Sequence, residues 1–572
     1  MPQVVDDVAS LLEHLNRRIA ELEARVSALE HPSPAMPAQV GSTSTMKSAQ
    51  GTESVPAELG TSGNVIAVLG KAVLAIAGAY LLRAIAESTP GAQFPMLLAG
   101  IVYACGWMAW AVRAHRTNHF ASAIYGTTAT LILAPLLYES TTKFELLSIN
   151  STAAILAAFA VLVLVLAWHS NLQVLPWVGT FASISTLWVL IFATHALLPL
   201  TSALLAIALA TEVAACLGHR LSLWVMAAIA ADAALALFVY VMTSPDGVPT
   251  SYTATRQSMT ALLSLSILGI YGGGIAVRSF GERKRISNFE ILQGAVVFGL
   301  SYLGATRASQ STVPILGALF LVLSLVCYWG ALSRFSGPQQ RRNRRVSASW
   351  AVLLMLIGVA LLFPSNASAL VFCLLGAGAV LLYRRNRDLG VALHASLYLA
   401  AAAVLSPFLR HTREALVGTV PGLPHWTVWI VLASTLFCYW IPSASAGESG
   451  RRRMLWVIPA GLACVGFTAL AVALLHALMA DRFALTPSHT AGIRTIVTCL
   501  AALSLGFLAS QFKRPELGWL AYVAVGLGAL KLFVEDLRLG NDASLVVSLL
   551  FYGLVLILLP RLQRRNISKS VA

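Results

Sequence analysis

The chain has 572 residues, of which 58% are hydrophobic and 11% are charged, and its formal net charge is +15. A soluble domain carries about 25% charged residues, so this composition excludes an ordinary soluble protein. Excess positive charge can indicate nucleic-acid binding, but the sequence has no groove-reading element or nucleic-acid motif, and we expect no nucleic-acid partner. The composition indicates a chain that lies mostly in a lipid bilayer.

Residues 1–30 have the pattern of a short coiled coil. Two sets of apolar residues repeat every seven positions, namely Val5, Leu12, Ile19 and Val26, and then Val8, Leu15, Leu22 and Leu29. β-Branched residues in the first set and Leu in the second favour a parallel two-stranded coil. We therefore predict a parallel homodimer through residues 5–30, with a single amphipathic helix as the alternative.

Residues 31–62 are rich in Pro, Ser, Thr and Gly and predict a flexible linker. The region 63–560 follows, and it consists of apolar segments close to the ~20 residues that cross a bilayer. A basic tail at 561–572 ends the chain. We predict an all-α, polytopic integral membrane helical bundle of about eighteen spans, at 65–85, 94–112, 120–138, 151–168, 172–194, 197–217, 221–242, 258–279, 288–306, 312–333, 347–363, 367–383, 389–408, 426–442, 454–478, 491–511, 517–535 and 543–560.

Lys and Arg concentrate in every second gap between these spans. Basic runs occur at 341–345, 384–387, 451–453 and 513–514, and this set of gaps holds about three times as many basic residues as the other set. Basic loops stay in the cytoplasm, so we predict that both termini are cytoplasmic and that the number of spans is even. Most Trp residues fall at the same predicted ends, where an indole ring suits the headgroup region.

Charged residues inside spans are the candidate functional residues. Asp232 lies at the middle of its span and must find a partner in the bundle or stay protonated, and it could couple transport to a proton or a cation. Glu212 lies near His219 and Arg220, and Lys71 lies near the start of the first span. For both we expect snorkelling toward the membrane surface. We treat Asp232, Glu212 and Lys71 as a candidate intramembrane polar site.

Other features are weaker signals. Lys531 and Glu535, one helical turn apart, predict an interfacial ion pair. His411, His425 and His489 lie in outer gaps without a metal-binding spacing, and Arg410, Arg413, Arg482 and Arg494 could together face an anionic ligand there. Gly269 and Gly273 predict close helix packing, as do the pairs Gly376/Gly378 and Gly526/Gly528. The sequence has no nucleotide, flavin, metalloprotease or hydrolase motif, so we expect no cofactor, metal site or catalytic residue.

The first span runs from Gly63-Asn64 through Gly70 and Gly78 to Leu81-Leu82-Arg83. It resembles the entry helix of a bacterial family of predicted polytopic membrane proteins of undefined function, which carry a cytoplasmic N-terminal coiled coil, a polar linker and many spans. Asn64 stands where that family usually has Trp. The resemblance implies the bacterial cytoplasmic (inner) membrane, and it implies no reaction.

Three classes of function remain open. The first, which the sequence favours, is a non-enzymatic envelope component held together by its coiled coil. The second is a transporter or flippase for an apolar or lipid-linked substrate, with Asp232 in its pathway. The third is a membrane enzyme that acts on a lipid-linked substrate through outer Arg and His residues. Few charges lie within the spans, which argues against a carrier of very polar solutes.

Overall fold

The computed structural model describes residues 58–571 apart from short gaps at 90, 116–117, 171–173, 219–222, 336, 338–339, 421, 444–453, 483 and 540–541. The predicted coiled coil at 1–30, its homodimer and nearly all of the predicted linker lie outside the described residues. The chain divides into two units, Met1–Asn64 and Val65–Ala572, and the second unit is described below.

All regular secondary structure in the described residues is helical. In chain order the helices are α2 (Glu58–Ser88), α3 (Gln93–His115), α4 (His119–Thr142), α5 (Ile149–Ser170), α6 (Val174–Thr194), α7 (Leu197–Cys216), α8 (Trp224–Met242), α9 (Gln257–Ala276), η1 (Val277–Gly281), α10 (Asn288–Ala308), α11 (Thr312–Trp329), η2 (Gly330–Arg334), α12 (Arg341–Leu362), α13 (Ser365–Asn386), α14 (Leu389–Leu405), α15 (Phe408–Leu416), α16 (Trp426–Ser443), η4 (Met454–Trp456), α18 (Val457–Ala480), α19 (Pro487–Gln511), α20 (Pro515–Lys531), η5 (Leu532–Asp536), α21 (Leu537–Leu539) and α22 (Asp542–Val571).

Each of the eighteen predicted spans corresponds to one of these helices. Among the described residues, sixteen helices are long and apolar enough to cross a membrane. The other two are α14, which bends by 69° into the short helix α15, and α16, whose apolar part Trp426–Ile441 is shorter. The protein is therefore an all-α, multi-pass membrane protein, as the sequence predicted.

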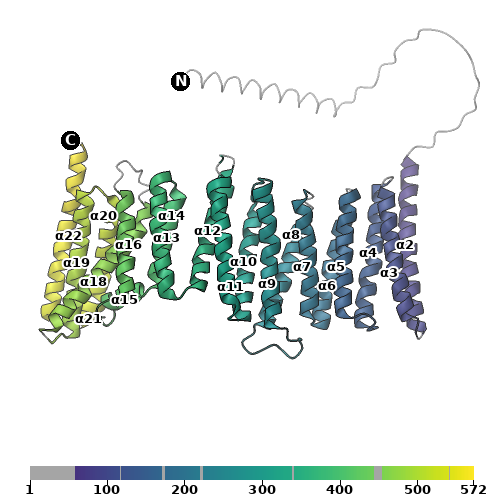
Figure 1. Ribbon diagram of the computed structural model, residues 1–572, viewed down its shortest axis with the longest axis horizontal. Helices are drawn as coiled ribbons and strands as arrows, with labels where there is room; N and C mark the ends of the chain where they lie inside the picture. Colours follow the sequence, from purple (N-terminus) through teal and green to yellow (C-terminus); the bar gives the residue numbers. More distant parts are fainter. Residues whose placement is uncertain are drawn as a thin grey trace, which may run out of the picture. The chain divides into compact units, whose positions relative to one another are not determined.

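Successive helices of the second unit run up and down and lie beside one another in approximate chain order (Figure 1). The Val65 end of α2 and the C-terminal end of α22 lie on the same side of the second unit. We call this side the basic end, because the turns α9–α10, α11–α12, α13–α14 and α19–α20 with their Lys and Arg residues lie there. The long Thr243–Arg256 connection lies at the opposite end. This arrangement agrees with the predicted alternation, and the cytoplasmic location of the basic end stays a prediction.

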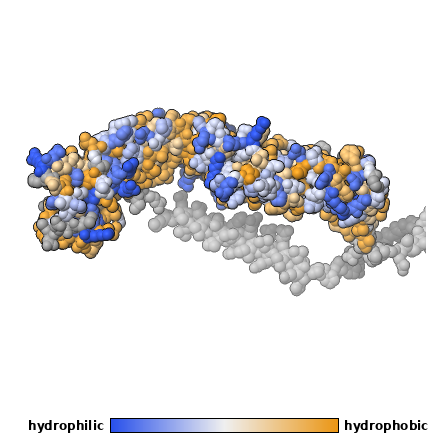
Figure 2. Space-filling model, turned by 90° about the horizontal axis from the view of Figure 1, so that it is seen from below, coloured by the Kyte–Doolittle hydropathy of each residue, from blue (hydrophilic) through white to orange (hydrophobic). Residues whose placement is uncertain are grey.

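The surface has polar ends and apolar sides, as a protein in a bilayer requires. Viewed from the end opposite the basic end, hydrophilic residues gather on the end face and hydrophobic residues border it (Figure 2). Large apolar side chains such as Leu74, Phe192 and Phe533 are exposed along the helices. In water such exposure would be unfavourable, whereas lipid tails solvate it.

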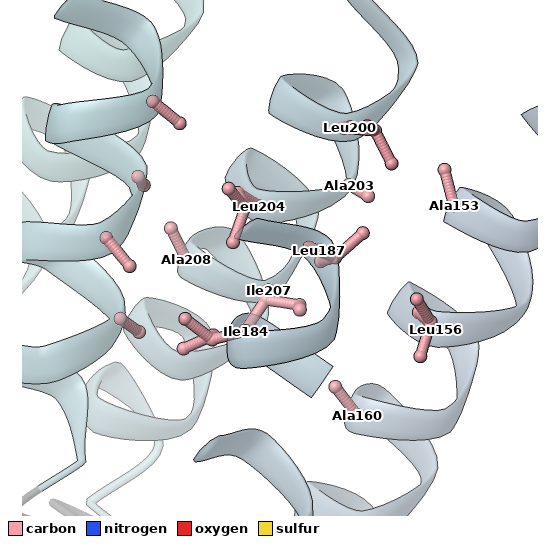
Figure 3. Packing of buried hydrophobic residues seen from close by; sticks show 14 of the residues in the cluster. Ala153, Leu156, Ala160, Ile184, Leu187, Leu200, Ala203, Leu204, Ile207 and Ala208 are labelled. Atoms are coloured by element: carbon pink, nitrogen blue, oxygen red, sulfur yellow. The ribbon is translucent and has the colours of Figure 1, made fainter. Parts of the chain in front are cut away.

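Three main clusters of buried apolar residues hold the helices together. The first extends from α2 to α10, and its centre is formed by α5, α6 and α7, where Leu156, Leu187 and Leu204 pack with several Ala residues (Figure 3). The second joins α13, α14, α16 and α18 to α22. The third lies between them, where Met355 of α12 packs with Phe372 of α13 and Tyr398 of α14. We call this contact of α11 and α12 with α13 and α14 the seam.

Close helix packing occurs at a site that the sequence did not indicate. A Cβ atom on Gly317 of α11 would lie 3.1 Å from the carbonyl oxygen of Gly358 of α12, and one on Gly358 would lie 3.0 Å from that of Gly317. By contrast, a Cβ on Gly269 or Gly273 would meet nothing within 4 Å. The prediction of close packing at Gly269 and Gly273 was wrong, because that face of α9 borders a cavity described below.

Candidate functional site

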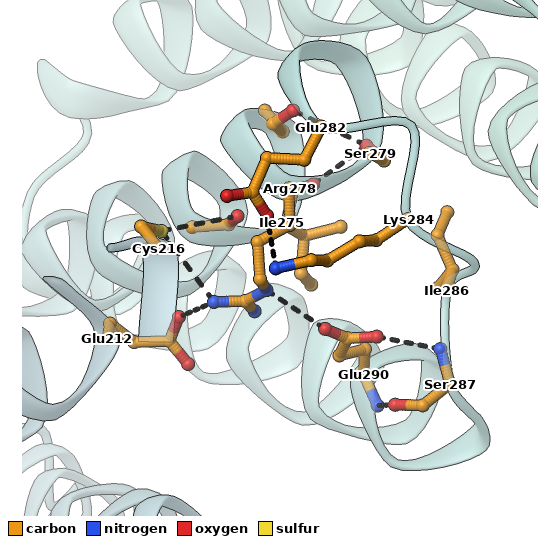
Figure 4. Close-up of polar contacts among 12 residues, drawn as sticks. Glu212, Cys216, Ile275, Arg278, Ser279, Glu282, Lys284, Ile286, Ser287 and Glu290 are labelled. Carbon is orange, nitrogen blue, oxygen red and sulfur yellow. Dashed lines mark hydrogen bonds and ion pairs between the residues drawn. The ribbon is translucent and has the colours of Figure 1, made fainter. Parts of the chain in front are cut away.

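Three charged residues from α7, η1 and α10 form a buried ionic cluster (Figure 4). Arg278 Nη1 donates to Glu212 Oε2 at 2.5 Å, and Arg278 Nε donates to Glu290 Oε1 at 3.1 Å. None of the three side chains is more than 4% exposed. We use the name ionic cluster for Glu212, Arg278 and Glu290.

Local backbone features position this cluster. Glu290 is the third residue of α10, and its Oε2 accepts from the backbone N–H of Ser287, whose side chain in turn caps the Glu290 N–H. This capping box fixes the Glu290 carboxylate at the helix start. Arg278 lies in the π-helical turn η1 that follows α9. Gly274 leaves room for the cluster, because a Cβ there would lie 2.3 Å from Glu212 Oε2.

Asp232 lies in the same group of helices. It is 8% exposed, and its Oδ2 accepts a hydrogen bond of 2.8 Å from Gln293 Nε2 of α10. Asp232 Oδ1 and the hydroxyl of buried Tyr271 on α9 have no hydrogen-bond partner among the described residues. The prediction that Asp232 faces the bundle interior and finds a partner there is confirmed.

The three residues predicted as an intramembrane polar site are not all together. Asp232 and Glu212 share the packing of α7 to α10, whereas Lys71 is exposed on α2. The prediction that Glu212 snorkels toward the membrane surface was wrong. Its side chain is 3% exposed, and its carboxylate bonds to the buried guanidinium of Arg278, 66 residues away in the sequence, in a charge-assisted pair that holds it in the interior.

A second set of buried charges lies where α19 meets η5, which we call the opposite-end cluster. Arg494 Nη1 donates to Glu535 Oε1 at 2.6 Å, and Lys531 Nζ lies 2.6 Å from Asp536 Oδ1 and 3.4 Å from Glu535 Oε2. The predicted Lys531–Glu535 pair is confirmed. The Arg494 guanidinium, which we considered for an anionic ligand, also binds the carbonyl oxygens of Glu414, Ala415 and Gly418 at the end of α15.

Two histidines of the outer gaps lie against hydroxyl groups of residues that are close to them in the sequence. His425 Nδ1 lies 2.8 Å from the Thr427 hydroxyl, and His489 Nδ1 lies 3.1 Å from the Thr486 hydroxyl. His411 is buried in α15. Within the described part of the chain, no group of three or more His, Cys, Asp or Glu residues is arranged to hold a metal ion.

A cavity of about 1070 Å³ lies in the seam, and we call it the seam cavity. Its walls are mainly apolar. Arg344 and Arg345 in the first turns of α12, and Arg387 at the end of α13, line its mouth at the basic end. The apolar lining comes from α11, η2, α13 and α14, and includes Leu325, Leu332, Leu374, Leu375, Leu382 and Leu393.

Three polar side chains line the inner part of the seam cavity. The Tyr328 hydroxyl lies 2.5 Å from the Tyr398 hydroxyl and 3.3 Å from His394 Nδ1. These groups are bonded to one another, so they offer a small polar site within an apolar wall. Sequence reasoning missed this cavity. It treated Arg344, Arg345 and Arg387 only as markers of topology.

Two further cavities are more apolar. One of about 640 Å³ lies between α16, α18, α19 and α20, with Arg514 stacked near Tyr439 and Trp440 at one end. The other, of about 400 Å³, lies between α9, α10, α11 and α12 and is lined by Glu290, Ser279 and the glycine face of α9. We call it the side cavity. Asp232 lines none of the three cavities described.

Comparison with known protein families, curated proteins and solved structures gives no match to this chain.

Proposed function

We propose that this membrane protein binds an anionic lipid or lipid-linked phosphate in the seam cavity and carries it as a transporter or flippase. The observation that supports the proposal is one continuous cavity with apolar walls and three arginines at its mouth. Its volume of about 1070 Å³ is slightly above the ~300–1,000 Å³ typical of small-molecule sites.

The depth of the seam cavity suits a lipid tail. Arg344 and Met355, both in its lining, are eleven residues apart on α12, which is roughly 16 Å along a helix axis. The hydrocarbon core of a bilayer is about 30 Å thick, so the cavity extends through about one leaflet. A single-tailed or double-tailed amphiphile could therefore place its chains against the leucines while its headgroup stays at the basic end.

The charge at the mouth suits a phosphate. Arg344, Arg345 and Arg387 line this end of the cavity together with one acid, Asp388. Arg344 Nη2 lies 3.9 Å from Asp388 Oδ2, and both side chains are about 40% exposed. An exposed pair at this distance is weak, so it does not prevent Arg344 from binding another anion. Arg binds phosphate through two parallel N–H···O bonds, which gives it geometric preference for such headgroups.

The membrane location, the family and the alternative functions expected from the sequence remain part of this proposal. With the basic end cytoplasmic, the seam cavity opens to the inner leaflet of a bacterial cytoplasmic membrane. Membership of the family with an N-terminal coiled coil rests on the resemblance of the first span. The non-enzymatic envelope component stays a prediction and becomes one outcome of the test below. No observation on the described residues favours the membrane enzyme.

The test is lipid movement in vesicles. The full chain is reconstituted into vesicles that contain phosphatidylglycerol with a fluorescent headgroup, and a membrane-impermeant reductant quenches the outer leaflet. Wild-type protein should also bring inner-leaflet lipid to the quencher. The triple variant R344Q/R345Q/R387Q should slow this by about tenfold or more, since a charge-assisted hydrogen bond contributes about 1.5–3 kcal/mol and about 1.4 kcal/mol is a factor of ten.

The matched control is R341Q/R384Q/R385Q, which removes the same charge from the same two helix ends but from residues that do not line the seam cavity. It should move lipid at the wild-type rate. Equal loss in both triple variants would contradict the proposal, because it would indicate a general charge effect. Lipid that binds at the arginines and never changes leaflet would leave a lipid-anchored envelope component and exclude the carrier.

A further inference from the structure

Three polar side chains from two helices lie together in the wall of the seam cavity. Tyr328 of α11 and His394 and Tyr398 of α14 all line the cavity, and we call them the polar trio. His394 is 8% exposed and Tyr398 is 2% exposed, so these two side chains belong to the interior and not to the lipid-facing surface. The polar trio is therefore a part of the cavity wall that a ligand inside the cavity would meet.

The polar trio has more hydrogen-bond donors than its internal bonds use. Each tyrosine hydroxyl has one proton, and a neutral imidazole has one N–H. Two contacts join the three groups, because the Tyr328 hydroxyl lies 2.5 Å from the Tyr398 hydroxyl and 3.3 Å from His394 Nδ1. Each contact uses one proton. At least one donor is therefore left over, whichever way the two bonds run, and a protonated imidazole would add another.

An unused donor in apolar surroundings is unfavourable until it finds an acceptor. No other hydrogen bond of the polar trio is present among the described residues. The rest of the inner lining is aliphatic and includes Leu325, Leu374 and Leu393. A ligand that fills this part of the cavity should therefore bring an acceptor to the polar trio.

The polarity of the seam cavity changes in a fixed order from the basic end inward. Arg387 and Asp388, where α13 ends and α14 begins, line its mouth. His394 is six residues further along α14 than Asp388, which is roughly 9 Å along the axis. Its side chain tilts back toward the start of the helix, so the ring lies closer to the mouth than that. Deeper in the cavity, the lining is formed by apolar residues such as Met355 and Leu374.

A diacyl glycerophospholipid has its groups in the same order. Its ester carbonyls follow the phosphate, and its acyl chains follow the esters. Five bonds separate the phosphorus atom from an ester carbonyl carbon, a span of roughly 6 Å at ordinary bond lengths, which suits the short distance between the mouth and the His394 ring. A carbonyl oxygen only accepts hydrogen bonds, as the unused donor requires. A polyprenyl phosphate has no oxygen below its phosphate and would leave that donor without a partner.

We propose that the ligand of the seam cavity is a diacyl glycerophospholipid, and that one of its ester carbonyl oxygens accepts a hydrogen bond from the polar trio. This inference rests on the proposed function, and it narrows the ligand from any lipid-linked phosphate to a lipid with ester carbonyls. The arginines at the mouth recognise the charge of the headgroup, the polar trio recognises the ester, and the apolar lining encloses the chains.

The test is lipid binding, which does not require that a lipid changes leaflet. The full chain in detergent is titrated with diacyl phosphatidylglycerol and with its dialkyl ether analogue, and native mass spectrometry counts the bound lipid. The two lipids share headgroup and chain length and differ in the carbonyl oxygens. Binding that is lost in R344Q/R345Q/R387Q is assigned to the seam cavity. At that site, wild-type protein should bind the ester lipid about threefold to tenfold more tightly, which is the contribution of one neutral hydrogen bond.

The variant Y328F/H394L/Y398F removes every donor of the polar trio at once. Because the bonded partners are replaced together by apolar groups of similar shape, the fold should be kept. This variant should bind the ester lipid as weakly as the ether lipid, and it should bind the ether lipid and a polyprenyl phosphate as wild type does. The matched control is Y103F/Y552F, which removes two hydroxyls that donate to backbone carbonyls of neighbouring helices outside the seam cavity. It should keep the preference for the ester.

Two results would overturn this inference and leave the proposed function standing. One is equal binding of the ester and ether lipids to wild-type protein at the arginine-dependent site, and this comparison decides even if Y328F/H394L/Y398F does not fold. The other is an ester preference that the folded triple variant retains. Lipid binding that is the same in wild type and in R344Q/R345Q/R387Q would instead contradict the proposed function itself, and the inference would fail with it.

Discussion

At the scale of single residues, the ionic cluster depends on a glycine, Gly274, because any side chain at this position would collide with the cluster. Glu212 reaches Arg278 across the backbone of α9 at Gly274, where a Cβ would lie 2.3 Å from Glu212 Oε2 and 3.3 Å from Arg278 Nη1. Cys216 of α7 lies close by, with its Sγ 3.8 Å from the Gly274 carbonyl oxygen. The glycine therefore sets how near α7 and α9 can approach.

Gly274→Ala should displace the Glu212 carboxylate and destabilise the protein by about 1–3 kcal/mol, the usual cost of overpacking a tight site. Gly269→Ala, on the same helix, is the control. Its Cβ would meet nothing within 4 Å, and alanine has the better helix propensity by up to about 1 kcal/mol. In detergent, the melting temperature should fall below that of wild type in Gly274→Ala and rise above it in Gly269→Ala. Equal melting temperatures would contradict the packing described.

Arg278→Met should leave two buried carboxylates without their cation, which destabilises a protein by about 3–5 kcal/mol. Adding Glu212→Gln and Glu290→Gln to this variant removes the uncompensated charges and should recover a large part of that loss. Thermal unfolding followed by tryptophan fluorescence measures both effects. If Arg278→Met is as stable as wild type, Glu212 and Glu290 do not rely on this guanidinium.

At the scale of secondary-structure elements, three π-helical turns coincide with the polar sites. η1 contains Arg278, η2 contributes Ala331 and Leu332 to the seam cavity, and η5 contains Glu535 and Asp536. A π-turn shifts the register of the residues after it and leaves carbonyl groups less well bonded, and such turns occur frequently at functional sites. The three π-turns therefore lie at the ionic cluster, the seam cavity and the opposite-end cluster.

The short helix α15 is held by a side chain from another helix. It has nine residues, too few to be stable alone in water, and it lies after the 69° bend that ends α14. Arg494 Nε donates to the Ala415 carbonyl oxygen at 2.8 Å, and its Nη2 donates to those of Glu414 and Gly418. These are the carbonyls that a helix end leaves without partners.

Arg494→Lys should loosen α15 although the charge is kept, because an ammonium cannot replace the fork of a guanidinium. Hydrogen–deuterium exchange of residues 408–418 should rise by about tenfold or more, which corresponds to about 1.4 kcal/mol of local opening. The control is Arg410→Lys, whose pair with Glu414 is 78% exposed on the arginine side. Unchanged exchange in Arg494→Lys would show that packing alone holds α15.

The elements were largely predictable from the sequence, because spanning helices follow from the length of apolar segments. α15 was missed, since its sequence FLRHTREAL is short and polar and resembles an outer loop. The hydrogen-bond and ion-pair partners of individual side chains were much less predictable. The burial of Asp232 followed from its central position, but the choice of Gln293 and the pairing of Glu212 with Arg278 depend on which helices become neighbours. The seam cavity depends on the same information.

At the scale of the whole molecule, the described bundle has two sets of helices, and the packing between the two sets is less complete than the packing within each set. One apolar cluster belongs to α2 through α10 and another to α13 through α22, while the cluster at the seam is interrupted by the largest cavity described. Side chains close-packed on both sides resist rearrangement. We therefore expect any shift between the two sets to occur at the seam, where the proposed lipid would bind.

Filling the seam cavity should separate lipid carriage from folding. Gly378 of α13 lines the cavity and a Cβ there would meet nothing within 4 Å. Gly378→Leu should therefore project an isobutyl group into the space proposed for a lipid tail, with all three arginines unchanged. We expect it to unfold at a temperature equal to or above that of wild type, because a residue other than Gly inside a helix improves helix propensity by about 0.5–1 kcal/mol, while lipid movement in vesicles falls by about tenfold or more. Gly106→Leu is the control, since Gly106 is exposed on α3 and also has open space around it. It should keep both properties. Full lipid movement in Gly378→Leu would mean that the cavity is not on the lipid path, even if the arginine variants had slowed transfer.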